Sequence, residues 1–403
     1  MMLLAILLTG CTADDDAPGR RPGRQATPVV QAPVHSTPDL PTLTAPTTTP
    51  FDPGAATFDP SVKHDVRLFI SPEIADRLRD HPEAWQKIDV IIDDHEMHDV
   101  AVRLKGHGSF QPYGAKANWK LSLDRYVADQ EHDGLDQLVL NNMTSDGTML
   151  AEHYAYRAYR AFGIPAPRSV HVRVVLNGEF EGTYLMVEEV DKRFLSRWYD
   201  DNDGSLYEMH DVDFVDDDVP LFDHDSGPDD RDPLYALADI LGDPDQRLVD
   251  EGDDVLDVDQ FTRYLGMSAV IGQFDAYPYS VPGDDLYLYV DPADGRIDVL
   301  PHGADETFGD RHRPVHYLFG RLGRACIAEP SCEQRFHDAI WSALEVVEDP
   351  AYIADLNDDY DNLTRARAME TRAHDEDPDT AFEAMREFLF ARGADLEAQP
   401  ELQ

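Results

Sequence analysis

The stretch Val-Arg-Leu-Lys-Gly-His-Gly-Ser at residues 102–109, followed by Lys-Ala-Asn-Trp-Lys-Leu-Ser-Leu-Asp at residues 116–124, is the most informative part of this chain. Its pattern predicts two strands joined by a glycine-bearing turn, with a lysine at the start of the second strand. Glycine lets a backbone approach an anion closely, because no Cβ blocks the approach. We therefore expect an anion site at Gly106, Gly108 and Ser109.

Basic residues gather in this stretch although the chain as a whole is strongly acidic. Its 403 residues hold 34 Lys and Arg against 80 Asp and Glu, which gives a formal net charge of −46. This balance favours solubility and argues against nucleic acid as a partner, because phosphate backbones bind basic surfaces. Against such a background, the group of Arg103, Lys105, Lys116 and Lys120 predicts a bound anion. A lysine there would contact phosphates as a compact point charge.

The N-terminus predicts a lipid anchor and a tether. A short apolar run ends in Leu-Thr-Gly-Cys at residues 8–11, which resembles a bacterial lipobox. We expect residues 1–11 to be a lipoprotein signal peptide with Cys11 as the lipidated residue; a chance apolar run is the alternative. Residues 12–60 are rich in Pro and Thr, which predicts a disordered linker. The location would then be extracytoplasmic, with the membrane contacted by the lipid anchor only.

Two further cysteines, Cys326 and Cys332, form an even pair once Cys11 is assigned to lipid. Outside the cytoplasm, this close spacing predicts a local disulfide. A zinc site is the weaker interpretation, because two cysteines without neighbouring ligands rarely bind zinc.

Residues 61–400 have the pattern of one α+β domain, with a strand-rich N-terminal part and a helix-rich C-terminal part. Strands are predicted at 66–70, 88–92, 100–105, 120–124, 138–142, 170–176, 182–187, 286–290 and 296–300. Helices are predicted at 148–162, at 258–274 and from about 333 onward, with 382–396 the clearest. The dipeptide Asn177-Gly178 predicts a tight hairpin turn. The aspartate-dense segment 198–258 is expected to be an acidic, solvated insertion.

Acidic residues follow several of these elements. Glu188 ends a strand, Asp275 follows an apolar helix, Asp285 precedes a strand and Asp305 follows one. Glu189, beside Glu188, is expected to be a surface acid. Phosphoryl transfer needs a lysine on the phosphates, a glutamate that holds it, carboxylates for Mg²⁺, and a group that positions the attacking hydroxyl. The ordered set of residues therefore indicates phosphoryl transfer.

These segments resemble the CotH kinase family, the spore coat protein H-like atypical kinases of the cell surface. The resemblance covers roughly residues 65–400. It is carried by 103–109 with Lys116, 177–188, Asp275, 287–289, 305–309 and 388–396. It implies a diverged protein-kinase-like fold that uses ATP with Mg²⁺ or Mn²⁺. It also implies transfer of the γ-phosphoryl group to Ser or Thr of a protein substrate at the cell surface, by a chain that we expect to be a monomer.

The resemblance also implies roles for single residues. Lys116 would contact the nucleotide phosphates together with Arg103 and the glycine turn. Glu188 would orient Lys116, and Asp275 would position or deprotonate the substrate hydroxyl. The metal ligands would be Asp305 and Asp285.

Two positions depart from the family pattern. Asp285 stands where the family often has asparagine, and Gly303 replaces an acid of the usual Trp-Asp-x-Asp. If the lost acid is a metal ligand, the enzyme is weak or inactive, and the alternative is a pseudokinase that serves surface or envelope assembly. A third hypothesis is a cation-dependent adhesin that uses the aspartates of 198–258.

Overall fold

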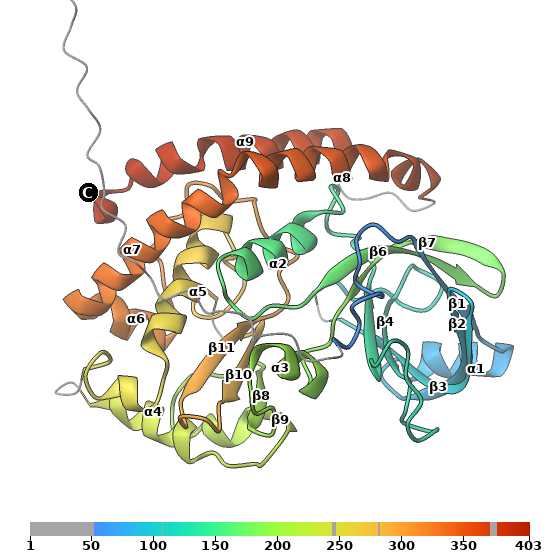
Figure 1. Ribbon diagram of the computed structural model, residues 1–403, viewed down its shortest axis with the longest axis horizontal. Helices are drawn as coiled ribbons and strands as arrows, with labels where there is room; N and C mark the ends of the chain where they lie inside the picture. The colour runs from blue at the N-terminus through green and yellow to red at the C-terminus, as the bar shows by residue number, and fades with distance from the viewer. Residues whose placement is uncertain (1–51, 107, 244–246, 281–282, 371–376) are drawn as a thin grey trace, which may run out of the picture. The chain divides into compact units, whose positions relative to one another are not determined.

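The computed structural model describes residues 52–106, 108–243, 247–280, 283–370 and 377–403 (Figure 1). The chain divides into two units, residues 1–36 and residues 37–403, and all described residues belong to the second. This unit mixes sheets and helices, with strands dominating its N-terminal part. The predicted α+β class is confirmed at this level.

The N-terminal part is a closed seven-stranded barrel in the order β1-β2-β3-β4-β5-β7-β6. Its strands are β1 (His64–Phe69), β2 (Gln86–Ile92), β3 (His95–Lys105), β4 (Asn118–Ser122), β5 (Gln137–Asn141), β6 (Ser169–Leu176) and β7 (Glu179–Val187). Helix α1 (Pro72–Asp80) joins β1 to β2. Neighbouring strands are antiparallel except for β1 and β6, whose parallel pairing closes the barrel.

Alternating side chains explain how the barrel packs on both of its faces. In β5, Leu138 and Leu140 point into the barrel core, whereas Val139 belongs to the large core shared with the helices. Successive residues of a strand point to opposite faces, so an apolar run can serve two cores. The predicted turn between β6 and β7 is confirmed: Asn177 and Gly178 both have positive φ, 52° and 88°.

A second sheet has the antiparallel order β11-β10-β8-β9. Its strands are β8 (Ser205–Met209), β9 (Asp223–Ser226), β10 (Leu286–Val290) and β11 (Ile297–Pro301). The segment 198–258 therefore is not the solvated insertion that we expected. It supplies a central strand, β8, whose Leu206 and Met209 are fully buried, and helix α4 (Asp232–Gly242). The many aspartates of this segment made the short strand β8 hard to recognise in the sequence.

The helices are α2 (Ala151–Ala161), α3 (Lys192–Trp198), α5 (Val258–Ile271), α6 (Arg321–Ala328), α7 (Pro330–Val347), α8 (Pro350–Met369) and α9 (Pro378–Glu397), with 3-10 turns at Val219–Leu221, Gly252–Asp254 and Pro400–Leu402. Helix α5 is buried along its length except at Asp259. It packs closely on α7, because Gly266 has no side chain: a Cβ there would lie 2.7 Å from that of Ala339. Helices α8 and α9 lie side by side (Figure 1).

The folded part begins earlier than predicted. Phe58 packs into the barrel core, and the Thr57 hydroxyl and amide both donate to Asp133. Residues 52–60 thus belong to the domain and not to the linker. Cys11 and the rest of the predicted anchor lie outside the described residues. Within those residues, no helix is both long and apolar enough to cross a membrane.

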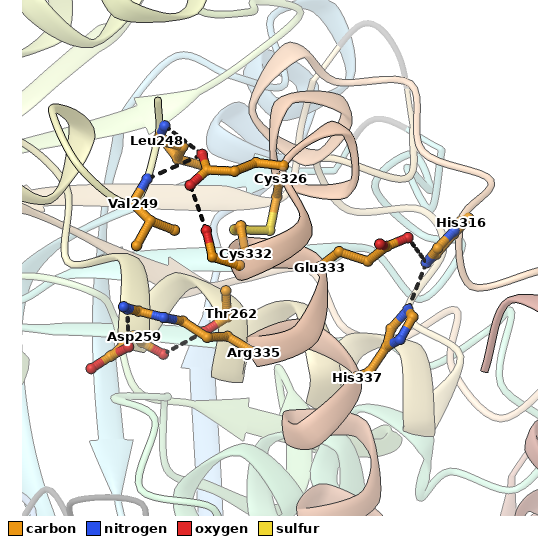
Figure 2. The surroundings of a disulfide bond; sticks show 12 residues. Leu248, Val249, Asp259, Thr262, His316, Cys326, Cys332, Glu333, Arg335 and His337 are labelled. Carbon is orange, nitrogen blue, oxygen red and sulfur yellow. Dashed lines mark hydrogen bonds and ion pairs between the residues drawn. A yellow bond between two sulfur atoms is a disulfide. The ribbon is translucent and has the colours of Figure 1, made fainter. Parts of the chain in front are cut away.

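The predicted disulfide is confirmed. Cys326 and Cys332 are joined with an S–S distance of 2.02 Å, which links the end of α6 to the first turn of α7 (Figure 2).

Candidate functional site

A cleft of about 600 Å³ brings together most of the residues predicted to form the site. Its lining includes Arg103, Gly106, Gly108, Ser109, Glu188, Asp275, Asp285 and Asp305. These residues come from β3 and its following turn, from the end of β7, and from the loops that flank β10 and β11. Lys116 is absent from the lining.

The basic wall of the cleft is built by the alternation of β3. Val102 and Leu104 point into the barrel core and are fully buried, so Arg103 and Lys105 point outward into the cleft. Lys120 of β4 is paired in register with Arg103 on the same face. This places positive charge along the outer side of two neighbouring strands.

The glycine turn is held in shape by asparagine. The Asn118 amide donates to the backbone oxygen of Ser109 at 3.3 Å and to its hydroxyl at 3.1 Å. Gly106 has φ of 108°, and a Cβ there would lie 2.9 Å from the Asn118 nitrogen. Gly108 has no neighbour within 4 Å of a Cβ position, so the backbone there is open to a ligand.

The predicted pair of Lys116 with Glu188 is wrong. The Lys116 Nζ lies 2.6 Å from Oε2 of Glu370, and both side chains are almost fully buried. A Cβ at Gly182 would lie 2.7 Å from Lys116 Cε, so the lysine sits against that part of β7. Glu188 follows six residues later, roughly 20 Å along an extended chain. The prediction for Lys116 failed because its backbone has a positive φ, 56°, which interrupts the two-residue alternation of strand side chains before β4.

Glu188 instead anchors two arginines. Its carboxylate oxygens accept from Arg168 at 2.7 Å and from Arg197 at 2.8 Å, and its side chain is 1% exposed. Its neighbour Glu189 accepts from Lys120 Nζ at 2.8 Å. Glu189 is buried, so the expectation that it is a surface acid is wrong. The lysine–glutamate pair beside the cleft is therefore Lys120 with Glu189.

The acidic wall consists of Asp275, Asp285 and Asp305, which the fold brings together from two loops: the first two lie between α5 and β10, and Asp305 follows β11. Burial raises the pKa of each carboxyl. Nearby acids add to the effect: Asp284 raises the pKa of both Asp275 and Asp285, and Asp146 raises that of Asp305. Carboxylates crowded in this way favour a proton or a cation among them.

Gly303 explains how the site accommodates the missing acid. Gly303 has φ of 54°, and a Cβ there would lie only 2.0 Å from Oδ1 of Asp285. The Asp285 carboxylate thus occupies the space that a side chain at position 303 would enter. The two departures from the family pattern are therefore linked in space, and a carboxylate is present where one had been thought lost.

One acid of the cleft, Glu152, was not expected at the site, and Lys105, although counted among the basic residues that predict an anion, had been given no role of its own. Glu152, in the first turn of α2, accepts from the Asn141 amide at 2.8 and 2.9 Å and from the Tyr156 hydroxyl at 3.2 Å. Burial, followed by the charge of Asp305, raises its pKa to about 7. Glu152 is the one acid of α2, beside His153, Arg157 and Arg160, and this was the available signal. The two-residue period of β3, which turns Lys105 to the same side as Arg103, was the signal for its role.

The donor set fits a hydrated magnesium or manganese ion. In the described part of the chain, the only three candidate ligands whose donor atoms lie within 4.8 Å of one another are elsewhere, so the cleft acids are more widely spaced. Mg²⁺ usually keeps several waters and takes one or two carboxylates together with substrate phosphates. Asp285 and Asp305, facing Lys105, meet that requirement.

Comparisons with known proteins agree with this part of the chain. The family model described as CotH kinase protein matches residues 102–390, which include every cleft residue discussed above. No curated protein matches the chain. Among solved structures, a chain of the Shewanella oneidensis MR-1 toxin–antitoxin complex of HipA, HipB and operator DNA is similar, with 11% identity, a TM-score of 0.31, and coverage of 81% of this chain and 71% of that one.

Proposed function

Because the chain belongs to the CotH kinase protein family, we propose that its cleft binds ATP with Mg²⁺ or Mn²⁺ and transfers the γ-phosphoryl group to a Ser or Thr hydroxyl of a protein. One observation supports this most directly. The basic residues of β3 and the glycine turn that follows it face Asp275, Asp285 and Asp305 across a single cleft. A diverged kinase-like fold is part of the same proposal.

The nucleotide phosphates are assigned to the β3 side of the cleft. Lys105 takes the role first expected of Lys116, with Arg103 beside it. The turn at Gly106 and Gly108 allows the backbone to approach an oxygen of the phosphate closely. Such a pocket offsets the repulsion that a polyanion would meet from a chain of charge −46.

The acidic side is assigned to the metal and the substrate. Asp285 and Asp305 would hold the divalent ion, which, when bound, neutralises charge on the phosphates. Asp275 follows the Gly272 cap of α5 and is exposed in the same cleft. It would accept a hydrogen bond from the incoming hydroxyl and take its proton as the new P–O bond forms, while the bond from the γ-phosphorus to the bridging oxygen breaks and ADP leaves.

The test is transfer of labelled phosphate. The purified protein is incubated with γ-labelled ATP, Mg²⁺ or Mn²⁺ and a generic protein substrate, beside Asp275→Ala and Asp305→Ala variants. We expect label with the wild type and a loss of about a hundredfold or more in both variants. Asp250→Asn, which changes an exposed acid outside the cleft, serves as the matched control and should keep full activity.

The outcomes separate the proposal from its alternative. Bound nucleotide without transferred label would support a pseudokinase that assists surface or envelope assembly. The position of Asp285 over Gly303 weighs against that alternative, because the site retains two carboxylates for the ion. Absence of both binding and label would reject the kinase proposal and its nucleotide-binding alternative together.

We further propose that the substrate lies at the cell surface and that Cys11 anchors the chain there through lipid. This rests on the pattern of residues 8–11 alone. Labelling cells with a radioactive fatty acid tests it: the wild type should carry label and Cys11→Ser should carry none.

A further inference from the structure

A second group of potential ligands lies outside the cleft. His316, Glu333 and His337 place one donor atom each within 4.8 Å of one another, and all three side chains are half-buried (Figure 2). His316 comes from the segment between β11 and α6, and the other two come from α7. The kinase proposal uses none of them.

The fold holds the three side chains in place before any ligand arrives. Glu333 and His337 are four residues apart on α7, so they lie on the same face, one turn apart. The disulfide of Cys326 with Cys332 fixes the start of that helix next to Glu333. Such support from the surrounding structure is what keeps metal ligands in position.

The distances match a site in which the two imidazole rings share a proton. Nε2 of His316 lies 2.8 Å from Nε2 of His337 and 3.8 Å from Oε1 of Glu333. Two imidazole nitrogens at 2.8 Å share one hydrogen. Two nitrogens bound to one tetrahedral zinc ion at about 2.0–2.1 Å would lie about 3.3 Å apart. Replacing the shared proton by the ion therefore requires the rings to separate by only about half an ångström.

We propose that His316, Glu333 and His337 form a binding site for a divalent transition-metal ion, with zinc as the best-fitting ion. Two imidazoles with one carboxylate are a known zinc donor set, and it leaves a fourth position for water or another ligand. Imidazole donors favour zinc over magnesium, which prefers oxygen.

Glu401 is the second observation that points to a cation here. Its Oε1 is buried and has no hydrogen-bond partner among the described residues, which is costly for a carboxylate. Burial lowers the pKa of His337, and His316 adds to this, whereas Glu333, Asp338 and Glu401 act in the opposite direction. Glu401 is thus near the site and would balance the charge of a bound ion.

The ion would join the segment before α6 to α7. That segment also contains Arg313, whose guanidinium donates to the backbone oxygen of Tyr279 at 3.1 Å and to that of Phe274, next to Asp275, at 3.5 Å. The expected role is structural, so this proposal stands independently of phosphoryl transfer.

Metal binding to the full-length protein tests the proposal directly. Metal-free protein is titrated with Co²⁺ and then with Zn²⁺, in excess Mg²⁺ that occupies the acidic cleft. We expect one equivalent of Co²⁺ with the strong visible absorption of a tetrahedral site, displaced by Zn²⁺, and a melting temperature raised by Zn²⁺. His337→Gln and Glu333→Gln should each weaken binding by about tenfold or more and abolish the zinc-dependent shift.

His312→Gln is the matched control, because His312 lies in the same segment but its side chain is 74% exposed. It should bind Zn²⁺ like the wild type. Equal affinity in the wild type and in both site variants would place the bound zinc on other surface acids and would overturn the proposal. Glu333→Gln keeps the shape of the side chain, so it remains informative if His337→Gln fails to fold.

Discussion

At the scale of single residues, the buried charges of this protein are distinguished by their partners more than by their positions in the sequence. Lys116 and Lys105 both lie near the glycine turn, yet one is sealed in an ion pair with Glu370 and the other lines the cleft. Asp285 and Gly303 are separated by a hairpin but compete for the same space. The role of each of these residues can therefore be tested by substituting it alone.

Lys105→Ala should reduce transfer from ATP by about a hundredfold or more, because the variant loses the positive charge nearest to the glycine turn. Initial rates over a range of ATP concentrations measure the effect. Lys87→Ala is the control: Lys87 is exposed on β2, where it pairs with Asp99. Equal losses in the two variants would contradict a specific role for Lys105.

The link between positions 285 and 303 can be tested by changing each residue in turn. Asp285→Asn should weaken Mn²⁺ binding by about tenfold or more, because the variant loses a carboxylate ligand. Gly303→Ala should weaken it as well, because a Cβ at position 303 would lie 2.0 Å from Oδ1 of Asp285 and would displace that carboxylate. Equilibrium dialysis with Mn²⁺ measures both variants, and an unchanged affinity in Asp285→Asn would remove Asp285 from the metal site.

Asp298 should make folding stability depend on pH. Its carboxylate on β11 accepts from the Tyr199 hydroxyl at 2.8 Å, and burial raises its pKa to about 7 from an ordinary 3.8. The folded state therefore holds this proton more tightly than the unfolded state does, and the associated stability is lost as pH rises from about 4 to above 7. Asp298→Asn should match the wild type near pH 4.

At pH 8, Asp298→Asn should exceed the wild type by on the order of 2 kcal/mol in free energy of unfolding. Urea titrations at the two pH values measure the difference. A gap between the proteins that is constant with pH would mean that Asp298 does not titrate in this range.

At the scale of elements, the sequence predicts those strands, turns and helices whose formation depends on neighbouring residues. The Asn177-Gly178 hairpin, the barrel strand that carries Arg103 and the burial of α5 could all be predicted, because turn geometry and hydrophobic period are local properties. The place of β8 could not be predicted, because its five residues are hidden among aspartates. The partner of Lys116 could not be predicted either: Glu370 lies 254 residues away.

The pair of Lys116 with Glu370 joins the loop before β4 to the end of α8, and this attachment can be tested by removing one charge or both. Lys116→Met should cost about 3–5 kcal/mol in free energy of unfolding, because it leaves a buried carboxylate without its cation. The double variant Lys116→Met, Glu370→Leu should recover most of that loss. Urea unfolding measures each, and equal destabilisation by the single and double changes would contradict the argument.

At the scale of the whole molecule, the folded unit includes residues that composition had assigned to a linker. A chain that lacks residues 1–51 should melt like the full-length protein, because it keeps Phe58 in the barrel core and the contacts of Thr57 with Asp133. A chain that lacks residues 1–60 should melt several degrees lower, since it exposes the apolar surface under Phe58. Calorimetry of the two truncations decides whether residues 52–60 belong to the domain.

The parallel pairing of β1 with β6 leaves the barrel without a free strand edge. In the other sheet, the outer strand β9 is four residues long and carries Asp223 and Asp225, and the backbone of the opposite outer strand, β11, bonds at Val299 to the Gln260 side chain. Unpaired backbone at a sheet edge is the usual template for aggregation between copies, and closure, shortness and charge each suppress it. Molecules of this protein can therefore be crowded together at high concentration with little tendency to form intermolecular β-structure.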